Sequence, residues 1–197
     1  MNDWYFNAQR PISNYLLFTP DGIAGGLRGT YFADMNFKEP IFTQQETPNR
    51  DWGLFPPNGL PSNNFSVIWE GKLEVPVDRE VGGWIGVATS ANCTAKLYID
   101  DYLVHDSPLS TTSTIQSNIP GLKFTQQHST DTPAGGSPFT FRKGAVHNMR
   151  LEFQAFQLER DMENVQTFNS KVELFWNLVD RQNSIEKVAF FCKIVLL

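Results

Sequence analysis

The residues of this chain that could carry acid–base, nucleophilic or metal chemistry are few and widely spaced. Its three histidines, His105, His128 and His147, lie too far apart to form a local metal-ligand motif. The sequence contains no Gly-x-Ser-x-Gly nucleophile elbow, no phosphate-binding glycine loop and no His-Glu-x-x-His zinc motif. A glycosidase needs two carboxylates placed across a sugar pocket, and no acidic pair marks such a pocket. We therefore expect surface or turn positions for the histidines, no metal, no cofactor and no catalytic residue, and whether the chain is an enzyme stays open.

One stretch does indicate ligand binding: the segment 106–138, which is rich in Ser, Thr, Gln and Pro. A loop of this length is normally either functional or disordered. Phe124 lies there outside any strand pattern, and its ring could stack on the C–H face of a sugar, while Lys123, Gln126 and His128 offer hydrogen bonds to hydroxyl groups. These four residues are the predicted binding site for an oligosaccharide or glucoside. The alternative is that Phe124 only anchors its own loop and that the polar residues are solvated.

Short stretches of alternating hydrophobicity, separated by turn residues, surround this segment. The clearest is 147–156, where Met149, Leu151 and Phe153 alternate with polar residues in the pattern of a half-buried strand. Short strands at regular spacing, without long helical patterns, predict an all-β fold, an antiparallel sandwich or barrel with a long inserted loop and a short C-terminal helix or strand beginning near Ser184. The predicted strands are 15–18, 27–33, 66–75, 84–88, 95–99, 102–104, 139–141, 147–156 and 172–178, with turns at 90–92, 100–101 and 143–144.

Two stretches interrupt the strand pattern before the centre of the chain. Residues 1–25 contain several Pro and Gly residues and are predicted to be largely irregular. Residues 34–63, rich in Pro, Asn and Gly, are predicted to be a long connection. Its large apolar side chains, Trp52, Phe55 and Leu60, are expected to pack this connection against the strands.

Composition narrows the possible partners. The chain has 197 residues, enough for one domain with a real core, and a net charge of −5 without a basic patch, which argues against nucleic acid. No apolar run approaches the roughly 20 residues needed to span a bilayer, so no membrane partner is expected. The start has no signal-peptide pattern, which slightly favours the cytoplasm without settling the localisation. Cys93 and Cys192 are the only cysteines, and we expect no disulfide framework.

The stretch from Gly82 to Ser107 reads as a strand ending in Thr-Ser, a turn, Leu-Tyr-Ile-Asp, a second turn and Leu-Val. This pattern resembles the central hairpin of the PA-14 domain, the β-barrel module first seen in protective antigen. The resemblance implies a PA-14-like β-barrel over residues 26–180, an N-terminal flank at 1–25 and a C-terminal flank at 181–197. Four other stretches follow the family's order along the chain: Gly-Leu-Arg-Gly-Thr-Tyr-Phe from Gly26, Pro-Ser-Asn-Asn-Phe-Ser-Val-Ile-Trp-Glu-Gly from Pro61, Arg-Lys-Gly-Ala-Val-His-Asn-Met-Arg-Leu-Glu-Phe from Arg142, and Lys-Val-Glu-Leu-Phe-Trp from Lys171.

The resemblance also carries an expectation about calcium. Similar domains in yeast adhesins bind sugar through a calcium ion held by an Asp-Asp pair in this hairpin, where many members read Ser-Asp-Asp-Gly. Here the position reads Ser-Ala-Asn-Cys over Ser90–Cys93, which offers one neutral oxygen and no carboxylate. The pair Asp100-Asp101 lies at the next turn, and we interpret it as a turn pair rather than as a replacement ligand. We therefore expect no stoichiometric calcium.

Further features resemble the PA-14 domain that is inserted into some family 3 glycoside hydrolases, the β-glucosidases. These are the long segment 106–138 ahead of strand 139–141, and the stretch 176–180 leading towards 185–188. The resemblance implies that the chain is part of a host glycosidase whose catalytic residues lie outside it, and that segment 106–138 shapes substrate specificity at the mouth of the host's active site. The alternatives are a stand-alone carbohydrate-binding or adhesion module, a purely structural or protein-interaction module, and an enzyme in its own right.

Overall fold

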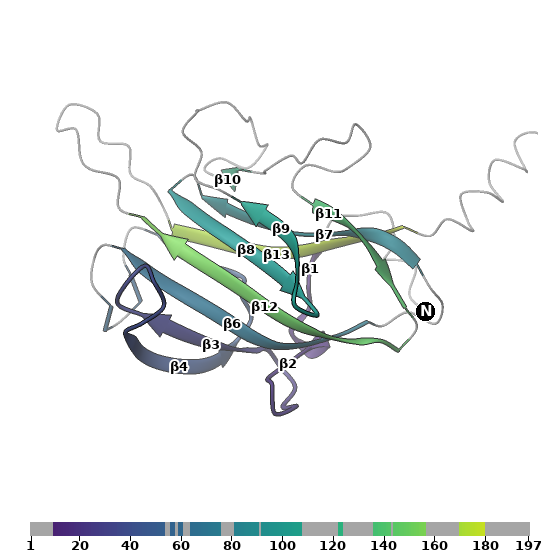
Figure 1. Ribbon diagram of the computed structural model, residues 1–197, viewed down its shortest axis with the longest axis horizontal. Coiled ribbons are helices and arrows are strands. Elements are labelled where there is room, and N and C mark those ends of the chain that lie inside the picture. Colours follow the sequence, from purple (N-terminus) through teal and green to yellow (C-terminus); the bar gives the residue numbers. More distant parts are fainter. Residues whose placement is uncertain are drawn as a thin grey trace, which may run out of the picture.

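Two antiparallel β-sheets packed face to face form the body of the chain in a computed structural model (Figure 1). The structure describes residues 10–53, 56–57, 59–60, 64–75, 81–90, 92–107, 122–123, 136–142, 144–156 and 170–179. Within these residues the only helix is η2, a single 3-10 turn at Asn14–Leu16. The predicted all-β fold class is therefore confirmed. The predicted helix near Ser184 and the residue Cys192 lie outside the described residues.

In the part of the chain that the structure describes, thirteen strands make up the two sheets. The first sheet contains β1 (Arg10–Pro11), β5 (Arg50–Gly53), β7 (Val81–Ser90), β10 (Leu122–Lys123), β11 (Gly136–Phe141) and β13 (Ser170–Val179). The second sheet contains β2 (Leu17–Phe18), β3 (Leu27–Phe32), β4 (Pro40–Glu46), β6 (Phe65–Glu74), β8 (Cys93–Ile99), β9 (Tyr102–Ser107) and β12 (Val146–Ala155). Its strands run in the order β4-β3-β6-β12-β8-β9, and β2 also pairs with β6.

The alternating sequence pattern explains why the central strands face as they do. In β12, Met149, Leu151 and Phe153 are buried while the residues between them are partly exposed, as the pattern predicted. On the facing sheet, β13 turns Leu174 and Trp176 into the same interior. Both central strands are paired on two sides, β12 with β6 and β8, and β13 with β7 and either β1 or β5.

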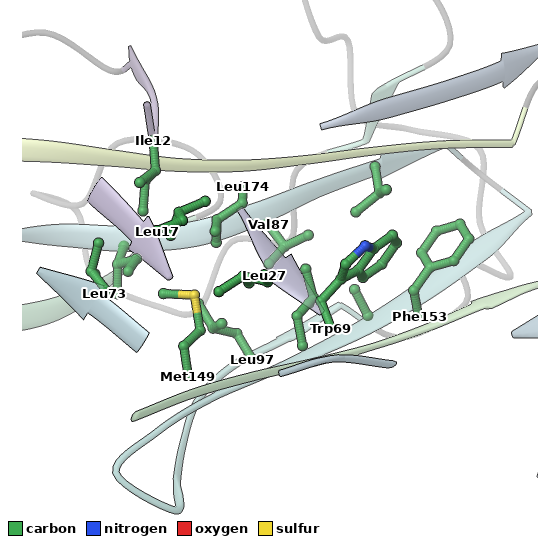
Figure 2. Packing of buried hydrophobic residues seen from close by; sticks show 14 of the residues in the cluster. Ile12, Leu17, Leu27, Trp69, Leu73, Val87, Leu97, Met149, Phe153 and Leu174 are labelled. Atoms are coloured by element: carbon green, nitrogen blue, oxygen red, sulfur yellow. The ribbon is translucent and has the colours of Figure 1, made fainter. Parts of the chain in front are cut away.

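Apolar side chains from both sheets fill one continuous core (Figure 2). Figure 2 shows Val87 and Leu174 of the first sheet beside Leu97 and Trp69 of the second. Burying a large apolar side chain contributes about 1.5–3 kcal/mol, so this shared interior is the main source of stability. At one end the core is aromatic: Trp52 packs against Tyr31, Phe65, Trp69 and Phe153.

The region 34–63 differs from the predicted long connection, because it contains strands β4 and β5. Most residues of β4 are exposed, since this strand is the edge of its sheet. It therefore lacks the buried alternating face that would have marked it in the sequence. Trp52 and Leu60 do pack on the core, as expected, whereas Phe55 lies outside the described residues.

Part of the predicted irregular start also belongs to the sheets. From residue 10 onwards, β1 pairs with β13 and β2 pairs with β6. Ile12, Leu16 and Leu17 are buried in the shared core. These two-residue strands are too short to produce a periodic signal in the sequence. The boundary at residue 26 was drawn from family resemblance and stays a prediction.

A buried carboxylate lies where the chain passes from one sheet to the other. Glu46 ends β4 with its side chain 7% exposed, and its Oε2 lies 2.7 Å from Nη2 of Arg50, at the start of β5. Trp69 donates its indole N–H to Oε1 at 2.9 Å, the hydroxyl of Tyr31 donates to the same oxygen, and Gln44 donates to Oε2 at 2.8 Å. Burial, with the carboxylate beside it, raises the pKa of Tyr31, so its hydroxyl stays a donor.

We expect Glu46→Gln to destabilise the chain strongly. An amide keeps the shape but removes the charge and replaces one acceptor oxygen with an NH2 donor that faces other donors. The free energy of unfolding should therefore fall by about 2–4 kcal/mol. The matched control is Glu152→Gln, because Glu152 pairs with Arg150 at 3.0 Å on a more exposed surface. This control should cost less than about 1 kcal/mol. If urea unfolding shows that both variants lose the same free energy of unfolding, Glu46 contributes no more to stability than a surface carboxylate.

Candidate functional site

Parts of three strands fall within the segment 106–138. β9 leads into it, β10 lies within it, and β11 begins near its end. Both β10 and β11 pair with β7, Lys123 opposite Thr89 and Gly136 opposite Gly86. Of the predicted sugar-binding residues, Lys123 is placed by its backbone in β10, whereas Phe124, Gln126 and His128 lie outside the described residues. Whether these residues form one site is therefore not tested by the structure.

Buried hydroxyl groups join the strands at the base of this segment. Thr89 of β7 and Ser107 of β9 are both fully buried, and their hydroxyl oxygens are 3.2 Å apart. The Thr89 hydroxyl also lies 3.4 Å from the carbonyl of Cys93 in β8. Since the backbone of Thr89 pairs with both β10 and β13, this residue connects four other strands. We call Thr89, Ser107 and Cys93 the anchor cluster.

At the turn between β7 and β8, the side chains of Ser90 and Asn92 form hydrogen bonds with other strands. Asn92 is 5% exposed, and its side-chain amide donates to the carbonyl of Phe156 at 3.0 Å, while the N–H of Phe156 donates to the Asn92 carbonyl at 2.9 Å. Ser90 accepts a hydrogen bond from the backbone N–H of Lys171 at 2.9 Å. These side chains fasten the end of β12 and the start of β13, which is a structural use of the position. Ala91 lies outside the described residues.

The second turn, Asp100-Asp101, joins β8 to β9. Both residues have left-handed backbone angles, with φ of 50° and 66°, as a two-residue hairpin turn requires. The Asp100 carboxylate accepts the N–H of Asn148 at 2.8 Å and lies 2.7 Å from Nδ1 of His147, so both its oxygens are engaged with β12. The interpretation as a turn pair is confirmed, but the side-chain hydrogen bonds reach a neighbouring strand rather than the turn itself.

The histidine prediction is wrong for His105. It is 3% exposed and points into the sandwich, because it sits opposite the buried Leu97 in the pairing of β8 with β9. Burial lowers the pKa of His105. His147 is also largely enclosed, with its side chain 13% exposed and its ring edge-on to Phe139. The missed signal was the inward alternation of His105 with Ser107, two polar residues in a strand where apolar ones are expected.

Among the described residues no group of three or more His, Cys, Asp or Glu side chains is placed to hold a metal ion. Nor does any helix in this part of the chain have the length and hydrophobicity needed to cross a membrane. Glu46, the most buried carboxylate described, is fully engaged with structural donors. At the start of segment 106–138, the anchor cluster joins β9 to β7 and β8.

Comparison with protein families gives one match. The model described as the PA14 domain matches residues 24–167, which is most of the chain. No curated protein matches the sequence. The ordered stretches that resembled this family in the sequence fall largely inside the matched region.

Solved structures share the fold at low sequence identity. A β-glucosidase from Kluyveromyces marxianus superposes with a TM-score of 0.58 and 16% identity, covering 91% of this chain and 20% of that one. A second structure of that enzyme, in complex with glucose, gives a TM-score of 0.55. An anti-sigma factor domain-containing protein from Clostridium clariflavum gives 0.51 with 21% identity, covering 78% of this chain and 42% of that one. This chain spans less than half the length of each relative, and the likeness shows a common fold.

We expect Asn92→Asp to destabilise the chain without creating a calcium site. The new carboxylate would face the Phe156 carbonyl in place of a donor, at a cost of about 2 kcal/mol or more. Asn14→Asp is the control, since Asn14 is exposed. Urea unfolding with and without calcium makes the measurement. Recovery of the lost stability by calcium would contradict this account, since it would mean that the turn can still assemble a cation site.

Proposed function

We propose that this chain, which belongs to the PA14 domain family, is the accessory domain of a β-glucosidase-like host and shapes which substrates reach the host's active site. The observation that supports the proposal is that the described parts of segment 106–138 all contact β7. Its bases, at β9, β10 and β11, lie against β7 and the anchor cluster. Binding residues are commonly carried on loops that a rigid scaffold positions. The fold shared with the β-glucosidase from Kluyveromyces marxianus supports the choice of host.

The domain acts by contact and exclusion. Phe124 would lie against the aglycone or the second sugar of a glucoside, and Lys123, Gln126 and His128 would bond its hydroxyl groups. Such contacts, made away from the bond that is cleaved, alter specificity without supplying a proton or a nucleophile. The catalytic carboxylates would come from the remainder of the host chain, which is the domain's main partner.

A glycan-array screen of the isolated chain, with and without EDTA, separates this proposal from its alternatives. An accessory domain gives weak or no binding by itself, because the site is completed by the host. Binding that EDTA abolishes would instead indicate a calcium-dependent adhesion module, with the Asp100-Asp101 turn as its candidate ligand. Binding that EDTA leaves intact would indicate a stand-alone carbohydrate-binding module.

We expect Phe124→Ala, made in the full-length host, to change substrate preference. Loss of one apolar contact should alter the ratio of kcat/KM for aryl glucosides over cello-oligosaccharides by about tenfold. Turnover of a small aryl glucoside at saturation should stay near its original value, because no catalytic group is removed.

The matched control is Tyr102→Ala. Tyr102 is an aromatic residue with 76% exposure at the tip of the β8–β9 hairpin, away from the anchor cluster. This variant should leave the preference unchanged. Unchanged preference in Phe124→Ala, or the same change in both variants, would count against the proposed role of the segment.

A further inference from the structure

A buried histidine lies in the strand that leads into the segment. His105 of β9 is 3% exposed and its Nε2 is enclosed, without a hydrogen-bond partner among the described residues. A neutral imidazole is tolerated in such a place. A protonated one would bring a charge and an unsatisfied donor into the interior, which is costly.

Few groups around His105 would stabilise its protonated ring. From β7, the backbone of Val87 favours the charged form, and so does the neighbouring Asp106 on its own strand. The thiol of Cys93 is engaged with Ser90 at 3.2 Å. Burial outweighs these contributions and lowers the pKa of His105. Leu97 lies opposite His105, and the buried or partly buried side chains described on β7, β8 and β11 that join the interior carry no charge, among them Val87, Thr89, Ala95, Phe139 and Phe141.

We propose that His105 is an acid-sensitive contact, which keeps β9 packed on β7 at neutral pH and loosens that packing when the ring takes up a proton. Two residues further on, Ser107 meets Thr89 in the anchor cluster, and Thr89 pairs with Lys123 of β10. A change at His105 therefore reaches the strands that anchor the segment. This inference goes beyond the proposed function and does not depend on it, because it concerns strands that can be studied without any sugar or host.

The sign of the effect follows from linkage between protonation and folding. The pKa of His105 is lower when β9 is packed than when it is released. The released form therefore binds more protons in the pH range between the two values. The packing is fully stable above the ordinary histidine pKa and weakens as the pH falls below it, by up to about tenfold in the opening equilibrium per pH unit.

Hydrogen exchange of the full 197-residue chain tests this directly. Peptides covering 84–90 and 102–107 are compared at about pH 7.5 and about pH 5, after correction for intrinsic exchange rates, with β12 as internal reference. We expect protection of these two peptides to fall by about tenfold or more at acid pH, while β12 changes less. Equal losses in β9 and β12, or no loss, would overturn the proposal.

Variants assign the effect to one histidine. His105→Gln and His105→Leu cannot take up a proton, so whichever of them folds should lose the selective pH dependence. His147→Gln replaces a histidine at the start of β12 that is hydrogen-bonded to Asp100. This control variant should keep the selective loss of protection at acid pH. The proposal would be overturned if a His105 variant still lost protection in the β7 and β9 peptides at acid pH. The wild-type comparison of β9 with β12 decides the matter even if neither variant folds. The proposed function would be unaffected by failure here, since sugar preference is measured separately.

Discussion

The carboxylate of Glu46, buried at the corner between the two sheets, constrains the whole sandwich. The chain leaves one sheet at the end of β4 and enters the other at Arg50, so the charge and its partner span the crossover. A buried charge is stable only when donors surround it, and Trp69 and Tyr31 supply them from the neighbouring strands. Gly29 leaves the necessary room, because a Cβ there would lie 2.8 Å from Trp69 Nε1 and 2.9 Å from Glu46 Oε1.

Strand β7 pairs with β10 and β11, two of the described strands of segment 106–138. It lies between β13 on one side and β10 and β11 on the other, and its Thr89 reaches β9 through Ser107. In the same region Asn92 binds the end of β12 with its amide, at the position where relatives that bind calcium are expected to carry carboxylates. Among the described residues, neutral hydrogen bonds of Thr89, Ser107 and Asn92 therefore join the strands in this region.

The fold was more predictable from the sequence than the site. β12 and β13 alternate cleanly because each has one face in the core, whereas β4 is an exposed edge strand whose polar residues conceal it. Glu46 could not be foreseen, since the donors that enclose it include Tyr31 and Trp69 from two other strands. His105 was misjudged because polar residues on an inward face break the pattern that marks burial. The sugar contacts of segment 106–138 were inferred from residue types alone, and residue types do not fix the position of a loop.

The central claim is that this domain selects substrates and does not catalyse. The most direct measurement is the kinetics of a full-length host in which residues 108–135 are replaced by a short Gly-Ser link between Ser107 and Gly136. We expect near-normal turnover of a small aryl glucoside and a preference for cello-oligosaccharides altered by about tenfold or more. An unchanged preference, or loss of turnover on both substrates by a folded enzyme, would contradict it.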